Sequence, residues 1–175
     1  LQRLEQALKQ GLRLVQFREP AWEQEQPNSS TLFDALQQTV ALCKRYQARC
    51  LVNSVHNLDW VQHCDGLHVR SSDATTLLQA SIRTQLSSTQ LLAMSAHTRT
   101  DLQLAQQLNT DFVVLGHVLD TPSHPHQPAL GWAQFSALAA EASCPVYAIG
   151  GQNPTTLTTA QAHGAHGIAG IRQLF

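Results

Sequence analysis

Residues 111–131 contain the side chains of this chain that are best suited to chemistry. The segment begins with an apolar run at residues 112–115 and breaks at Gly116. It continues as a loop that carries His117, Asp120, Thr121, Ser123, His124 and His126. Histidine exchanges protons near neutral pH, and hydroxyl groups bind phosphate oxygens. A buried strand that ends in such a loop is how parallel α/β barrels build active sites, so the segment predicts one.

His117 is the candidate catalytic residue of this loop, because it directly follows the predicted strand. A histidine in that position can act as a general acid or base. The alternative is a histidine that packs under the loop and has no chemical role. His124 and His126 lie among prolines and are also typical of solvated loop residues. The spacing of the three histidines matches no standard zinc motif.

Glycines at the ends of the last two predicted strands suggest a phosphate site. They are Gly150 and Gly151 after one strand, and Gly167 and Gly170 around the next. Glycine lets the backbone approach an anion, and the N-terminus of a following helix contributes N–H groups. Arg172 could add a charge-assisted contact. The alternative is that the glycines only satisfy tight turns.

Other predicted strands also end in polar side chains. These are Gln16 and Arg18, Asn53 and Ser54, His68 and Arg70 with Asp73 after them, and Ser95 and His97. Gln16 and Arg18 are two positions apart on a strand and therefore face the same side. An arginine there suits a phosphate or a carboxylate ligand, or else a structural salt bridge. Asp73 is also the type of residue that caps a helix.

Short apolar strands alternate with helical patterns along the whole chain. Strands that are apolar on both faces are typical of a parallel sheet covered by helices. About seven such strands favour an α/β TIM barrel, (β/α)8, over a doubly wound sheet, because no GxGxxG motif follows any strand. The chain starts on a helix, so the first strand is expected to lie outside it. The 175 residues are predicted to form a single domain, and the strand missing from its start leaves open that they are the C-terminal part of a longer protein.

Residues close together in the sequence predict a loop and the N-termini of two helices. Residues 21–30 are polar and are predicted to be a loop, after which Ser29 or Ser30 caps a helix. Asn153 is predicted to cap another helix, with Pro154 at its first position.

Composition narrows the classes of partner. The chain is 43% hydrophobic with a formal net charge of -1, and no run of Lys and Arg indicates nucleic-acid binding. No apolar run is long enough for a bilayer, and no signal peptide is seen, so we expect no membrane partner and a cytoplasmic location. Cys43, Cys50, Cys64 and Cys144 form no CxxC pair and are expected to be thiols of a reducing compartment.

Several motifs in the same order resemble the thiamine phosphate synthase and TenI thiazole tautomerase superfamily over essentially the whole chain. They are VQFRE at 15–19, VN at 52–53, DGLH at 65–68, SAH at 95–97, GHV at 116–118, TPSH at 121–124 and AIGG at 148–151. The resemblance implies a (β/α)8 barrel whose first strand precedes residue 1. It also implies a ligand that is a thiazole or thiamine phosphate.

The synthases of this family couple a pyrimidine diphosphate to a thiazole phosphate and use Mg²⁺. By resemblance, Gln16, Arg18 and Asn53 would bind the pyrophosphate, and Asp73 would be one of two magnesium ligands. The family lysine after Arg-Glu is Pro20 here, and the other magnesium aspartate is Ser54. Ser is a poor magnesium ligand compared with a carboxylate, and a diphosphate leaving group needs its charge neutralised.

The phosphate-binding loop of the synthases, Thr-x-Thr-Lys, corresponds to Thr121, Pro122, Ser123 and His124. The hydroxyls are retained and the lysine is lost. The resemblance further implies substrate or phosphate contacts at Ser95, Gly150, Gly151, Gly170 and Arg172.

The tautomerase branch needs no metal, because it aromatises a thiazole phosphate carboxylate by shifting a proton. Its motif has a histidine at the position of His117, so the resemblance favours tautomerisation with His117 as the catalytic residue. An active synthase with an altered metal site, in which Mg²⁺ would be a cofactor, is the first alternative.

A non-catalytic phosphate-binding module is the second alternative. The TPSHP segment followed by Gly131-Trp132, and PVYAIGG at 145–151, resemble synthase-like domains fused behind Nudix hydrolases. The partner would then be an N-terminal Nudix domain. A homodimer is also left open.

Overall fold

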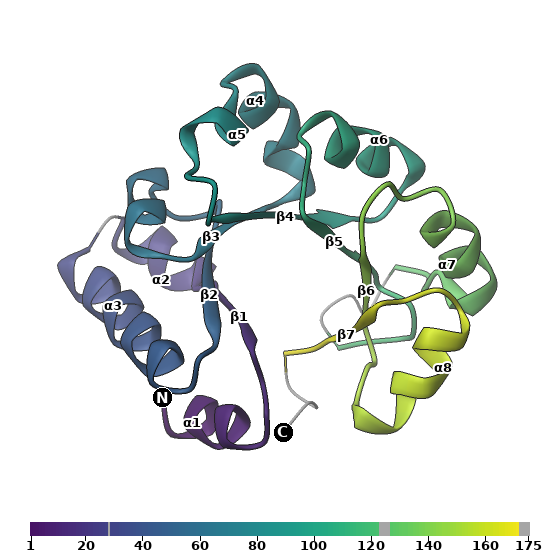
Figure 1. The fold of residues 1–175 in the computed structure, drawn as a ribbon, viewed down its shortest axis with the longest axis horizontal. Helices are drawn as coiled ribbons and strands as arrows, with labels where there is room; N and C mark the ends of the chain where they lie inside the picture. The colour runs from purple at the N-terminus through teal and green to yellow at the C-terminus, as the bar shows by residue number, and fades with distance from the viewer. Residues whose placement is uncertain (28, 123–126, 172–175) are drawn as a thin grey trace. The chain divides into compact units, whose positions relative to one another are not determined.

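The computed structural model describes residues 1–27, 29–122 and 127–171 (Figure 1). These residues fall into two compact units. Unit 1 comprises Leu1–Arg70 and Thr84–Leu92. Unit 2 comprises Ser71–Arg83 and the described residues from Ala93 onward. Parallel strands alternate with helices in both units.

Unit 1 contains three parallel strands, β1 (Leu14–Phe17), β2 (Arg49–Asn53) and β3 (Gly66–Val69). Leu51 in the middle of β2 lies opposite Gln16 on one side and Gly66 on the other. The helices of this unit are α1 (Gln2–Lys9), α2 (Pro20–Glu25), α3 (Ser30–Arg45) and the short 3-10 helix η1 (Leu58–His63). The helix α5 (Ile82–Gln85) has residues in both units.

The helix α3 packs against β1 and β2 through one apolar face (Figure 1). Its N-terminus is capped as predicted, because the Ser29 hydroxyl accepts a hydrogen bond from the Leu32 N–H at 3.1 Å. Leu36 and Cys43, two residues of this face, are fully buried. Burial of this face against the strands is what stabilises the helix.

The prediction of a loop at residues 21–30 was wrong, because α2 occupies Pro20–Glu25. The helix buries none of its residues, so no apolar stripe marked it in the sequence. Pro20 stands in its first turn, where a missing N–H costs nothing. A contact distant in sequence then holds it: His56 Nδ1 lies 2.8 Å from Glu23 Oε2, and the Glu19 N–H donates to His56 Nε2 at 3.0 Å.

Unit 2 contains three whole strands, β5 (Phe112–Gly116), β6 (Val146–Ile149) and β7 (Gly167–Ala169). It also contains the residues of a fourth strand, β4 (Leu91–Ala96), that pair with β5. All four strands are parallel. Every residue of β5 is buried. Its helices are the 3-10 helices η2 (Ser71–Asp73) and η3 (Pro154–Thr156), with α4 (Ala74–Gln79), α6 (Arg99–Gln107), α7 (Gly131–Ala139) and α8 (Leu157–Ala162). Asn153 caps η3 as predicted, since its side chain accepts from the Thr155 N–H at 2.9 Å.

The α/β prediction is confirmed, with seven strands in the described residues. Within each unit, strands that follow one another in the chain also pair in the sheet, which is the order of a barrel and differs from that of a doubly wound sheet. The expected strand before residue 1 stays a prediction. All four cysteines are free thiols. None of the helices in the described ranges is both long enough and apolar enough to cross a bilayer.

Candidate functional site

Unit 1 holds a polar network of Gln16, Asn53 and His68, which we call the amide–histidine network. The Asn53 Nδ2–H donates to Gln16 Oε1 at 2.9 Å, and Gln16 Nε2 lies 2.7 Å from His68 Nδ1. Asn53 and His68 are buried, with 2% and 3% of their surface exposed, whereas Gln16 is exposed. The structure therefore brings together two predicted ligand-binding residues, and it adds His68, which the sequence placed at a strand end without a role.

Burial keeps the His68 ring neutral. Removal from water, and after it the positive charge of Arg18, lower the pKa of His68 to about 4. Both effects disfavour the charged imidazolium. His68 is therefore a neutral hydrogen-bonding group at physiological pH rather than a proton carrier.

The low pKa of His68 predicts a loss of stability in acid. An unfolded histidine titrates near 6.5, so between about pH 6.5 and pH 4 the unfolded chain binds a proton that the folded protein excludes. The free energy of unfolding is then highest above this window and falls as the pH drops through it, by about 2–3 kcal/mol in total. Urea unfolding of the wild type and of His68→Leu at about pH 7 and about pH 4.5 measures the effect. An equal pH dependence of the two proteins would contradict it.

Arg18 follows β1 and Ser54 follows β2, the two strands that carry Gln16 and Asn53. The Ser54 hydroxyl accepts a hydrogen bond from the Arg70 N–H at 2.9 Å, so it supports the backbone where the synthases have a magnesium ligand. The Arg18 side chain is exposed and makes no hydrogen bond or ion pair with any described residue. Its guanidinium is therefore available to an anionic ligand.

In unit 2, His117 follows the buried strand β5 and is itself buried, with 7% of its surface exposed. Its Nε2 lies 3.2 Å from the carbonyl oxygen of Gln127. A carbonyl oxygen only accepts, so Nε2 carries the hydrogen and Nδ1 is the nitrogen that can take up a proton. The same hydrogen bond would also hold a histidine that merely packs under the loop.

Gly150, after β6, packs directly against His117. The backbones run together there: the Val118 N–H donates to Ile149 O at 2.8 Å and the Leu119 N–H to Gly150 O at 3.3 Å. A Cβ added at Gly150 would lie 2.4 Å from the Cβ of His117, and the φ of Gly150 is +95°. This contact requires glycine even without a ligand, and it places the predicted phosphate loop beside the predicted proton carrier.

His97 is a second histidine next to this strand end. Its Nδ1 lies 2.5 Å from the carbonyl oxygen of Gly116, the residue before His117, so Nδ1 donates the hydrogen bond. The residue is exposed. The SAH motif marked this position in the sequence, but only the pairing of β4 with β5 brings it beside Gly116.

Asp73 occupies the N-cap position of α4, but its side chain makes no capping hydrogen bond to that helix. The Ser72 hydroxyl donates to its Oδ1 at 3.0 Å. No group of three or more His, Cys, Asp or Glu side chains in the described part of the chain could hold a metal ion. One carboxylate, with serine at the position of the other ligand, is a weak donor set for Mg²⁺ and does not fit that ion.

The remaining predicted residues are distributed over unit 2. Ser95, on β4, lies opposite Val114 and is half-buried, as is Thr121. Gly151 follows Gly150 with a φ of +66°, and Gly170 follows β7. Ser123, His124 and Arg172 lie outside the described residues.

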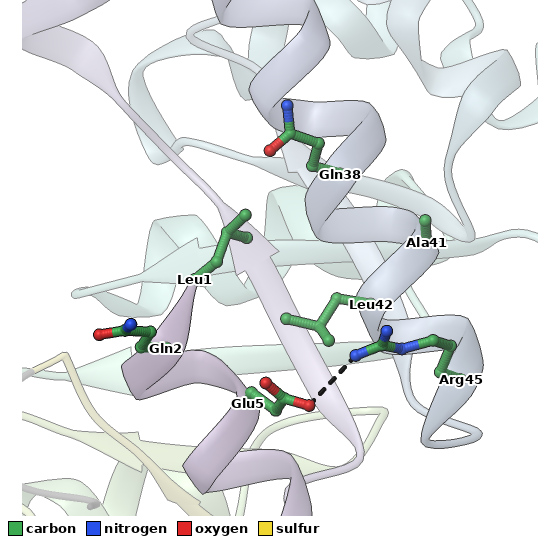
Figure 2. Close-up of a pocket in the computed structure, with 7 residues that line it drawn as sticks. All are labelled: Leu1, Gln2, Glu5, Gln38, Ala41, Leu42 and Arg45. Carbon is green, nitrogen blue, oxygen red and sulfur yellow. Dashed lines mark hydrogen bonds and ion pairs between the residues drawn. The ribbon is translucent and has the colours of Figure 1, made fainter.

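A groove elsewhere in unit 1 is unrelated to these residues. Figure 2 shows that it lies between α1 and α3 and is lined by Leu1, Gln2, Glu5, Gln38, Ala41, Leu42 and Arg45. Its two charged groups neutralise each other, because Arg45 donates to Glu5 at 3.1 Å. None of the predicted site residues lines it.

The sequence of this chain is similar to those of known thiamine-phosphate synthases. The family model described as thiamine monophosphate synthase matches residues 1–174. The chain is 28% identical over 171 residues to a putative thiamine-phosphate synthase 2 of Aquifex aeolicus, and it spans 87% of that protein. It is 31% identical to the putative thiamine-phosphate synthase of Geobacter sulfurreducens over 95% of this chain and 75% of that one.

Some relatives are much longer than this chain. It is 31% identical to the thiamine-phosphate synthase of a Synechococcus species over 97% of its own length, but it spans only 46% of that protein. Among solved structures, the thiamine phosphate pyrophosphorylase of Pyrococcus furiosus matches 97% of this chain and 77% of its own, with a TM-score of 0.74 and 18% identity. That likeness shows a shared fold.

Proposed function

Because the chain belongs to the thiamine monophosphate synthase family, we propose that it binds a thiazole phosphate and isomerises it by moving a proton. Coupling of a thiazole phosphate to a pyrimidine diphosphate is the less favoured reaction.

The contact between His117 and Gly150 is the observation that carries the proposal. A tautomerisation needs one group that accepts and returns a proton, and a site that holds the phosphate so that the reacting carbon stays in reach. In unit 2 the histidine and the glycine loop touch, as the 2.4 Å approach of an added Cβ demonstrates. His117 Nδ1 would remove a proton from the thiazole ring carbon and return it at the position that completes the aromatic system. No atom is gained or lost in this step.

Some of the residues that a coupling reaction needs are replaced by others in this chain. A departing pyrophosphate develops charge that metal ions and lysines neutralise. This chain has Pro20 in the place of a lysine, and Ser54 is occupied by the Arg70 N–H. Proton transfer within one bound molecule creates far less charge, so it tolerates these losses.

Each of the two units contains candidate groups for binding of the phosphate. In unit 2, Gly150 and Gly151 are half-buried glycines with positive φ after β6, and Thr121 carries a hydroxyl group. In unit 1, Arg18 offers a cation and Gln16 an amide donor, and the buried Asn53 holds Gln16 through its Nδ2–H. Roles for Ser95, Ser123, His124, Gly170 and Arg172 remain predictions from the family pattern.

The test is an assay of the purified chain with two substrate sets. One reaction contains the non-aromatic thiazole phosphate carboxylate alone, and the other contains a pyrimidine diphosphate, a thiazole phosphate and Mg²⁺. We expect aromatic product in the first and no thiamine phosphate in the second. Thiamine phosphate formation would overturn the proposal in favour of an active synthase. Binding without product in either reaction would favour the non-catalytic module, for which an attached Nudix domain remains a prediction.

A further inference from the structure

We propose that His68 is a positioning residue: together with Asn53 it holds the Gln16 carboxamide in one orientation, and so determines which hydrogen-bonding group unit 1 offers to a phosphate ligand. The inference rests on the proposed binding of such a ligand at Gln16. His68 would not touch the ligand and would act through Gln16.

The orientation of the network starts from a backbone donor that cannot be reversed. The Val55 N–H donates to Asn53 Oδ1 at 3.0 Å, so the other end of that amide is Nδ2. Nδ2 donates to Gln16 at 2.9 Å, so the atom it meets is Oε1. Gln16 Nε2 then faces His68 Nδ1 at 2.7 Å, and this nitrogen must accept.

His68 is suited to accept because its ring stays neutral. Burial and the charge of Arg18 hold its pKa to about 4, so Nδ1 has a free lone pair at neutral pH. A charged ring would place N–H groups of His68 and Gln16 face to face. A neutral ring that carries its hydrogen on Nε2 accepts at Nδ1, so each donor from the Val55 N–H to Gln16 Nε2 meets an acceptor.

The orientation matters because Gln16 is exposed and the two residues behind it are buried. Phosphate oxygens accept hydrogen bonds, and an amide presents either N–H or C=O at a given place. With His68 as the acceptor, the group on the His68 side is N–H, and Arg18 is close enough for its charge to act on His68. A flipped amide would put a carbonyl oxygen there and repel the anion.

The experiment compares three variants, with 4-methyl-5-(2-hydroxyethyl)thiazole phosphate as the probe. His68→Leu removes the acceptor, and His68→Asn restores one, because its Oδ1 can take the place of Nδ1. We expect the dissociation constant, measured by calorimetry, to rise about tenfold or more in His68→Leu and to stay within about threefold of the wild type in His68→Asn. In turnover, KM should rise in His68→Leu and kcat should not fall. His63→Leu, an exposed histidine of η1, is the control and should change neither.

A spectroscopic readout tests the inference without any ligand. Long-range ¹H–¹⁵N spectra of the wild type should show His68 protonated on Nε2 and bare on Nδ1. In Gln16→Glu the side chain at position 16 no longer donates, so the proton should move to Nδ1. A wild-type Nδ1–H form, or wild-type affinity in a folded His68→Leu, would overturn the inference. If the spectra agree but the wild type binds no thiazole phosphate, the proposed function fails while the orientation by His68 stands.

Discussion

Replacing His117 with glutamine is expected to abolish thiazole phosphate isomerisation while the fold and ligand binding persist. The glutamine Nε2–H₂ can still donate to the Gln127 carbonyl, which His117 Nε2 contacts at 3.2 Å. The variant lacks only the basic Nδ1. General acid–base catalysis by a positioned side chain contributes typically 10²–10⁴-fold, so kcat should fall by at least about 100-fold. Steady-state kinetics and calorimetric titration of the phosphate ligand measure the two halves of this prediction.

The control is His166→Gln, which changes a histidine at the opposite end of the strands in unit 2. His166 precedes β7, and its ring lies against the edge of Tyr147. We expect its kcat to stay close to the wild-type value. Undiminished turnover in a folded His117→Gln variant would remove His117 as the proton carrier. His97, which donates to the neighbouring Gly116 carbonyl, would then be the next residue to replace.

Replacing Gly150 with alanine is expected to destabilise the protein and disrupt the site together. The φ of +95° costs an alanine about 1 kcal/mol, and its Cβ would lie 2.4 Å from the Cβ and 2.7 Å from the Cα of His117. A backbone atom cannot move aside as the end of a flexible side chain can, so one of the two loops must shift. We expect a loss on the order of 2–4 kcal/mol in the free energy of unfolding, measured in urea, and loss of turnover.

Gly164→Ala is the matched control for this substitution. Gly164 has nearly the same φ, +91°, but an added Cβ would only meet the Ala139 Cβ at 3.8 Å, an ordinary contact. It should therefore cost only the conformational strain, about 1 kcal/mol, and leave kcat unchanged. Equal unfolding free energies for the two variants would show that the contact with His117 does not require glycine.

Elements with a strong local signal were predicted well from the sequence. The strand predicted at residues 112–115 is found as β5, and Ser29 and Asn153 cap their helices as expected. Apolar runs, cap residues and prolines act within a few positions, so their effect is visible without the tertiary structure. The helix α2 was missed because it buries no side chain and is held by His56, more than thirty positions away.

The roles of individual histidines could be predicted from the sequence only in part. The sequence identified His117 by its place after a strand and a glycine, a local pattern that barrels share. It could not identify the role of His68, which depends on Gln16, 52 positions away, and on burial that lowers the pKa. Nor could it show that Gly150 touches His117, since that contact follows from the pairing of β5 with β6.

By itself, then, the sequence determined the alternation of parallel strands and helices, the family and the polar residues at the strand ends, because periodicity and motifs are local. Only the tertiary structure decided which of those polar residues meet. Strand pairing places Gln16, Asn53 and His68 in one network, and His117 against Gly150. Hydrogen bonds then assign a donor and an acceptor to each atom of those side chains. The physical reason is that proton position, pKa and steric fit depend on distances and burial between residues far apart in the chain.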